Sequence, residues 1–138
     1  FGDIWSKKLF TGMKGKKILI LAGISGALAV GLGAFGAHGL EPVLIQNGRL
    51  DTFETAVSYH FYHALALFGI GLLALLKPDW KYLSFSAWCM VLGILIFSGS
   101  LYVLSLTGIT WLGAITPIGG VGFILGWLGL AYSALKNN

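Results

Sequence analysis

Charged side chains are scarce in this sequence. Asp, Glu, Lys and Arg make up 10% of the 138 residues, and hydrophobic residues make up 57%. Typical soluble domains have about 25% charged residues. A water-soluble fold of this composition would not have enough polar groups to cover its surface. The composition therefore excludes an ordinary soluble domain and predicts a protein that is embedded in the lipid bilayer.

Features of catalysis are also lacking. The single cysteine, Cys89, has no partner for a disulfide within the chain. No nucleophile–base pair, phosphate-binding loop or helix-borne pair of carboxylates is recognisable. We therefore predict that the protein is not an enzyme, and we assign it no catalytic residue, no metal and no cofactor.

Three long segments have no charged residue: Ile18–Leu40, Thr55–Leu76 and Tyr82–Leu135. The last contains 54 residues, which is about twice the ~20–25 residues that one membrane-spanning helix needs. It must cross the bilayer twice, with a turn at 107–110. We predict an all-α bundle of four transmembrane helices in one domain over 18–136, with the helices at about 18–38, 53–76, 82–106 and 111–135.

Basic residues are distributed unevenly between the two ends of such a bundle. The end with both termini and the second loop has eight lysines, whereas the other end has only Arg49. Because basic loops stay on the cytoplasmic side, we expect both termini in the cytoplasm and a multi-pass protein of the bacterial plasma (inner) membrane. The net charge of +4 is then a consequence of topology, and no basic groove for nucleic acid is visible.

A short basic tail, residues 1–17, precedes the first span. The segment 13–17, Met-Lys-Gly-Lys-Lys, resembles a natural start, so we expect residues 1–12 to be an extension. The tail is interpreted either as a helix lying on the membrane surface or as a disordered segment. The first span is too long for the core of a typical signal peptide, and we expect it to be retained.

Small residues recur at four-residue spacing in the first span, as in Ala22/Gly26 and Gly23/Ala27. Such ladders let helix backbones approach closely in lipid. Because the ladders cover more than one face, we expect this helix to pack on two neighbours. The predicted helix-packing glycines of the first and fourth spans are Gly23, Gly26, Gly33, Gly36, Gly119, Gly120 and Gly126.

Two short patterns bear on where helices begin. Asp51-Thr-Phe-Glu54 has the form of a capping box for the second span. Pro117 predicts a kink or an irregular turn near the start of the fourth span.

Two histidines, His60 and His63, lie inside the second span, where an ionisable side chain is costly. Counting 1.5 Å per residue from Thr52 places His63 about 16 Å along the helix, in the outer half of the bilayer. Polar residues of the other spans fall at a similar depth. We therefore predict one polar layer that contains the candidate pocket residues His38, Tyr59, His63, Ser98, Ser100, Tyr102 and Thr116.

Three interpretations of this layer are open at this point. In the first, the polar side chains hydrogen-bond between helices and fix the register of the bundle. In the second, they form a site for a small molecule or a proton. In the third, the His-x-x-His pair supplies two ligands to a metal or a haem, but zinc usually takes at least three protein ligands, and only His38 is available as the third.

Four ordered motifs are similar to those of a known family: Gly33-Ala-Phe-Gly-Ala-His-Gly-Leu40, Tyr59-His-Phe-Tyr-His-Ala-Leu65, Phe97-Ser-Gly-Ser-Leu-Tyr102 and Thr116-Pro-Ile-Gly-Gly120. They resemble a family of small membrane proteins of unknown function, YwdK-like and YgdD-like in bacteria and transmembrane protein 256-like in animals. The resemblance covers residues 16–136 and implies a four-helix membrane protein without an established activity. The family's pattern has Gln at the position where this chain has His60, whereas His38 and His63 match it. This difference weakens the metal interpretation and leaves His38 and His63 as the candidates.

These observations predict a small structural or accessory membrane protein that packs on itself or on a larger membrane complex. The alternative is a small-molecule or proton-handling site in the outer half of the bundle, centred on His63. The expected partners are the lipid bilayer and other membrane helices, and nucleic acid is not among them.

Overall fold

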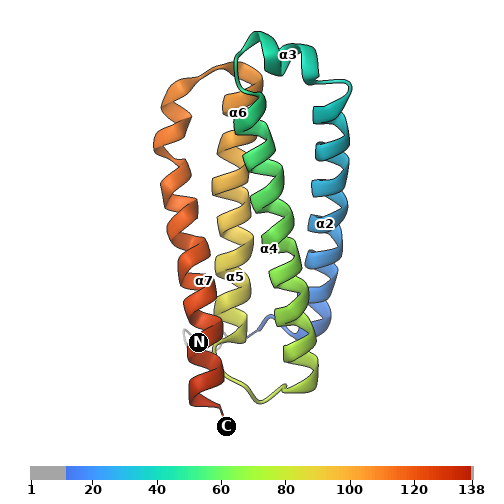
Figure 1. Cartoon of the computed structure of the whole chain (residues 1–138). Helices are drawn as coiled ribbons and strands as arrows, with labels where there is room; N and C mark the ends of the chain where they lie inside the picture. The colour runs from blue at the N-terminus through green and yellow to red at the C-terminus, as the bar shows by residue number, and fades with distance from the viewer. Residues whose placement is uncertain (1–11, 138) are drawn as a thin grey trace, which may run out of the picture.

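Four long helical stretches run side by side and alternate in direction in the computed structural model, which describes residues 12–137 (Figure 1). Each stretch is long and apolar enough to cross a membrane. The prediction of an all-α bundle with four membrane-spanning helices is confirmed. The predicted basic tail falls mostly on residues 1–11, which lie outside the described residues. The four stretches are α2 (Gly15–Ala37), α4 (Leu50–Leu76), a third span of α5 (Leu83–Gly93), η1 (Ile94–Ser98) and α6 (Gly99–Thr107), and a fourth of η2 (Thr110–Ala114) and α7 (Thr116–Lys136).

A short helix, α3 (Glu41–Gln46), closes one end of the bundle between α2 and α4, away from the two ends of the described chain (Figure 1). With six residues it is too short to show a helical period in the sequence, and it was not predicted. Asn47 follows it and donates through Nδ2 to the carbonyl oxygens of Ser105 and Leu106, at 3.0 and 3.2 Å. These two bonds tie the connection to the end of the third span.

The predicted capping box at Asp51 and Glu54 is wrong. α4 begins at Leu50, and no side chain caps it. The carbonyl of Arg49 accepts a hydrogen bond from the backbone N–H of Phe53, at 3.0 Å, so the helix is already formed at Asp51. The carboxylate of Asp51 therefore lies in the first turn, where it interacts favourably with the helix dipole.

The turn between the third and fourth spans falls where the sequence predicts it. Gly108 follows the last residue of α6 with φ of 74°, the left-handed conformation that glycine adopts without strain. The 3₁₀ helix η2 then precedes α7, whose first turn contains Pro117. Proline is tolerated there because the first backbone N–H groups of a helix have no acceptor within it. The predicted irregular turn near Pro117 is confirmed.

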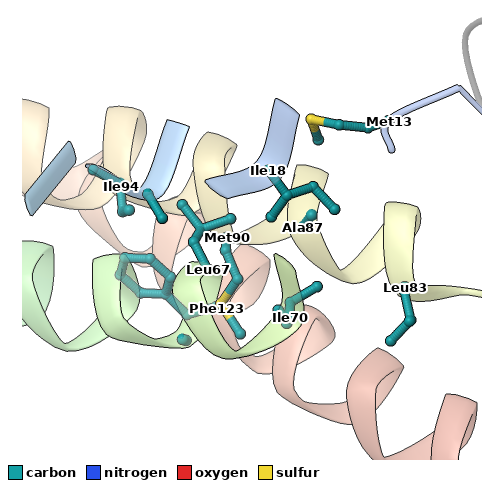
Figure 2. Close-up of a cluster of buried hydrophobic side chains, with 11 residues drawn as sticks. Met13, Ile18, Leu67, Ile70, Leu83, Ala87, Met90, Ile94 and Phe123 are labelled. Carbon is teal, nitrogen blue, oxygen red and sulfur yellow. The ribbon is translucent and has the colours of Figure 1, made fainter. Parts of the chain in front are cut away.

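An apolar core occupies the part of the bundle toward the ends of the described chain. Buried side chains from all four spans meet there, among them Ile18 of α2, Leu67 and Ile70 of α4, Met90 of α5 and Phe123 of α7 (Figure 2). Most of the buried histidine, serine and threonine side chains belong instead to the half nearer α3. The two halves of the bundle therefore pack by different interactions.

The third span changes its main neighbour at η1, a single π-helical segment. Before it, α5 packs chiefly against α7, whereas after it α6 packs against α4. A π-turn adds one residue to an α-helix, which rotates the following side chains by about 100°. The segment thus lets one continuous span face two different helices.

α2 has a single long neighbour. It packs along its length against α4, and within the described part of the chain it makes no comparable contact with the third or fourth span. The expectation that the first span packs on two neighbours is wrong for one copy of the chain. The opposite face of α2 is left without a protein partner.

The predicted helix-packing glycines fall into two groups, those that contact a neighbouring helix and those that do not. A methyl group added at Gly36 would collide with the ring of Phe53, and one at Gly119 would collide with the backbone of Phe97. Added methyl groups would also contact neighbours at Gly33, Gly120 and Gly126, whereas at Gly23 and Gly26 they would meet nothing within 4 Å. The role of Gly23 and Gly26 is therefore not set by packing within this chain.

Candidate functional site

His60 connects three helices. Its Nδ1 lies 2.9 Å from the hydroxyl oxygen of Tyr102 on α6, and its Nε2 lies 3.1 Å from Oγ of Ser25 on α2. The side chain is only 5% exposed. We refer to Ser25, His60 and Tyr102 as the His60 cluster. It is the point where α2, α4 and the third span are linked by polar groups.

His63 faces a different helix. The indole Nε1–H of Trp127 on α7 donates to Nε2 of His63, at 3.2 Å, so Nδ1 carries the ring hydrogen and donates to the carbonyl of Tyr59, at 2.6 Å. The imidazole also stacks on Phe123, with ring centroids 3.5 Å apart and planes inclined by 10°. Both ring nitrogens and one ring face are therefore occupied by protein groups.

Three hydroxyl groups of the predicted layer also bridge helices. Ser98 Oγ, in η1, donates to the carbonyl of Ala56 on α4, at 2.8 Å. Ser100 Oγ on α6 and Thr116 Oγ1 at the start of α7 lie 2.6 Å apart. These bonds satisfy polar groups that would otherwise face hydrocarbon, and they fix how the helices are placed along one another.

His38 and Tyr59 are exposed, and only Tyr59 lies beside a buried histidine, with its ring centroid 5.9 Å from that of His63. His38 follows the last residue of α2, and its side chain is exposed. Tyr59 is 40% exposed and packs its ring against Phe97, with centroids 4.7 Å apart. The structure therefore does not gather the seven predicted residues into one pocket. It divides them among separate contacts between helix pairs.

His60, Ser25 and Trp127 are not among the pocket residues predicted from the sequence, although all three make hydrogen bonds between helices. His60 and His63 are three residues apart and therefore differ by about 60° around α4, enough to direct them toward different neighbours. Which neighbour each one meets depends on how the helices are arranged, and the sequence alone does not give this. Within residues 12–137 no group of three His, Cys, Asp or Glu side chains is placed to hold a metal ion.

Comparison with known proteins places this architecture in a family. Residues 32–120 match the family described as "Protein of unknown function (DUF423)". The chain belongs to this family. The match includes the whole of α4 and the third span, which carry His60, His63, Ser98, Ser100 and Tyr102. It also includes Thr116 at the start of α7.

Similar proteins from several bacteria cover nearly the same length. The UPF0382 membrane protein YwdK of Bacillus subtilis is 50% identical over 121 residues, which is 88% of this chain and 98% of the relative. A UPF0382 membrane protein of Staphylococcus epidermidis is 46% identical over 124 residues, with 88% and 97% covered, and one of Haemophilus influenzae is 41% identical over 121 residues, with 88% and 95% covered. No solved structure matches the chain.

The names of these relatives agree with the bundle. They are described as membrane proteins, and within residues 12–137 this chain has four helices able to span a membrane. It is thus a small membrane protein of a family of unknown function.

Proposed function

We propose that this chain is a non-enzymatic accessory protein of the bacterial plasma (inner) membrane, and that it acts as a homodimer joined through α2. The free face of α2 carries this proposal. Gly23 and Gly26, which line one groove beside α2, have open space where a side chain would begin. A glycine-rich helix face without a neighbour fits a contact that forms only on association.

The face is shaped for a second helix. A groove beside α2 and α4 is lined by Ala22, Gly23, Gly26, Ala27 and Val30 on its α2 side and by apolar side chains of α4. Small residues four apart allow two helices to cross with their backbones close together. A symmetric dimer places the same face of each copy in contact, so one self-complementary surface is sufficient.

A role in assembly also agrees with how the buried polar groups are used. Ser98 and His63 each bond a neighbouring helix, and Ser100 pairs with Thr116. Such bonds contribute about 0.6 kcal/mol each on average in membrane proteins. A site centred on His63 is less favoured, because both nitrogens of its ring already have protein partners.

The charge distribution supports the orientation within this proposal. Lys14, Lys16, Lys17, Lys77, Lys81 and Lys136 belong to the end of the bundle that holds both ends of the described chain, and Arg49 lies at the other end (Figure 1). By the positive-inside rule the lysine-rich end faces the cytoplasm.

Cysteine cross-linking in native membranes tests the dimer. With Cys89→Ser as background, we expect Gly26→Cys to form a disulfide-linked dimer on oxidation. Gly69→Cys on α4, where an added side chain also meets nothing within 4 Å, is the matched control and should stay monomeric. If Gly26→Cys were cross-linked to a different protein instead, the homodimer proposal would be wrong and α2 would be a contact within a larger complex. Equal behaviour of the two variants would contradict a specific contact through α2.

A further inference from the structure

A half-open cleft of about 240 Å³ separates α2 from the third span, with α4 as its floor. The described residues that line it are aliphatic or glycine, apart from the three members of the His60 cluster. A cavity with an apolar wall and a few converging polar groups is the usual form of a small-molecule site. The cleft lies beside the His60 cluster and is distinct from the α2 groove at Gly23 and Gly26.

The His60 cluster has one hydrogen more than it uses. Ser25, Tyr102 and the neutral imidazole of His60 each carry one donor hydrogen, but only two hydrogen bonds join them. If Nε2 of His60 carries the hydrogen, it donates to Ser25 and accepts from Tyr102, and the Ser25 hydroxyl hydrogen is left over. In the other tautomer the Tyr102 hydroxyl hydrogen is left over. Either way, one hydroxyl at the cleft is free to donate to an oxygen of a ligand.

The depth of the cluster restricts what that oxygen belongs to. α4 has 27 residues and is about 40 Å long, so about 5 Å extends beyond a ~30 Å hydrocarbon layer at each end. His60 lies ten residues after Leu50, which is about 15 Å along the helix and about 10 Å inside the hydrocarbon. The ester oxygens of a phospholipid stay near the headgroups, outside this layer. An uncharged molecule with a carbonyl group that dissolves in the hydrocarbon reaches the cluster.

The cleft extends from the cluster toward the middle of the bilayer. Leu67 on its floor lies seven residues further inward than His60, or about 10 Å, and Val91 on its wall lies about 16 Å inward of Tyr102. A single substituted ring with a narrow chain matches this space, whereas a lipid with two acyl chains does not.

The π-helical segment η1 shapes the wall of the cleft. Ile94 and Leu95 of η1 line it, and Gly99 follows with open space where its side chain would begin. π-turns within α-helices are frequent at functional sites. Here the π-turn turns Tyr102 toward His60 and leaves a hollow at Gly99.

We propose that this cleft binds an isoprenoid quinone. One ring carbonyl accepts a hydrogen bond from the free hydroxyl of the His60 cluster, the ring lies between α2 and the third span near Gly99, and the isoprenoid chain follows Leu67 and Val91 toward the bilayer centre. The proposal concerns binding and does not depend on the α2 dimer.

Thermal unfolding of the purified chain in phosphatidylcholine nanodiscs tests the site, with a benzoquinone carrying a two-isoprene tail as the probe. A ligand that binds only the folded state raises the unfolding temperature with its concentration. We expect a saturable rise for the unchanged chain and none for Gly99→Leu, which fills the hollow. Gly69→Leu adds the same side chain at another open position and should respond like the unchanged chain.

Tyr102→Phe keeps the shape of the cleft and removes one hydroxyl. Ser25→Ala removes the other hydroxyl. The one of these two variants that removes the free hydroxyl should raise the quinone concentration needed for half of the shift by about fivefold, the effect of losing one ordinary hydrogen bond. No rise in the unchanged chain, or an equal rise in Gly99→Leu, would overturn the proposal. If palmitic acid raised the unfolding temperature equally and competed with the quinone, the cleft would be a site for an acyl chain and the quinone proposal would be wrong.

Discussion

At the scale of single residues, the two histidines of α4 differ in role because they contact different neighbouring helices. They are three residues apart and equally buried, at 5% exposure. His63 has Trp127, Phe123 and the Tyr59 carbonyl around it, so both nitrogens and one face of its imidazole contact protein groups. His60 is held only through two hydroxyl groups and lines a cleft. The first is a structural residue, and the second is the candidate for contact with a ligand.

Replacing His63 by alanine should destabilise the bundle. The change removes the ring that stacks on Phe123 and leaves the indole N–H of Trp127 without its acceptor. We expect the free energy of unfolding to fall by about 2 kcal/mol or more, measured by denaturant titration in detergent. His38→Ala is the control, because His38 is exposed at the end of α2 and should change this value by less than about 0.5 kcal/mol. Equal effects of the two variants would refute this division of roles.

At the scale of helices, the closest approach is between the third and fourth spans. The backbone of Phe97 in η1 lies against Gly119 of α7, so close that an added methyl group cannot be accommodated. One residue along, Gly120 faces only the ring of Phe97, 3.8 Å from where its methyl carbon would be. The two glycines look alike in the sequence but differ in what they contact.

Gly119→Ala and Gly120→Ala should therefore behave differently. The first forces η1 and α7 apart and should lower the free energy of unfolding by about 1–3 kcal/mol. The second makes ordinary contact and reduces the freedom of the unfolded chain, so its effect should be below about 1 kcal/mol and stabilising. Thermal unfolding of both variants in the same detergent measures the difference. Similar melting temperatures would mean that η1 and α7 are not in tight contact.

The helices themselves could be predicted from the sequence, but the π-turn and the partners of the buried polar groups could not. Charge-free runs such as 18–40 give the number and rough bounds of the spans, because lipid excludes charge regardless of how the helices pack. The π-turn at η1 has no signature in Ile94–Ser98, since it depends on which helices the two halves of the span must face. The structure places Ser98 and Ser100 in the half of the bundle nearer α3, and their partners depend on that same rotation.

At the scale of the whole molecule, the positions of the lysines predict the orientation of the bundle in the membrane. On a Cys89→Ser background, Gln46→Cys and Asp79→Cys place single thiols in exposed connections at opposite ends of the bundle. We expect a membrane-impermeant maleimide to label Gln46→Cys from the outside and Asp79→Cys only after the cytoplasmic side is opened. The reverse labelling pattern would show that the termini lie outside.

The pairing of helices also bears on how the protein is made. α2 packs against α4 and α5 packs against α7, so each half of the chain is an antiparallel hairpin. The first is joined by residues 38–49, which contain α3, and the second by a short turn at Gly108. The first hairpin is complete once Leu76 has left the ribosome, before the third span emerges from it. Assembly in the membrane then needs only one later step, in which the two hairpins pack together. In that step the Ser98 hydroxyl forms its hydrogen bond to the carbonyl of Ala56 on α4.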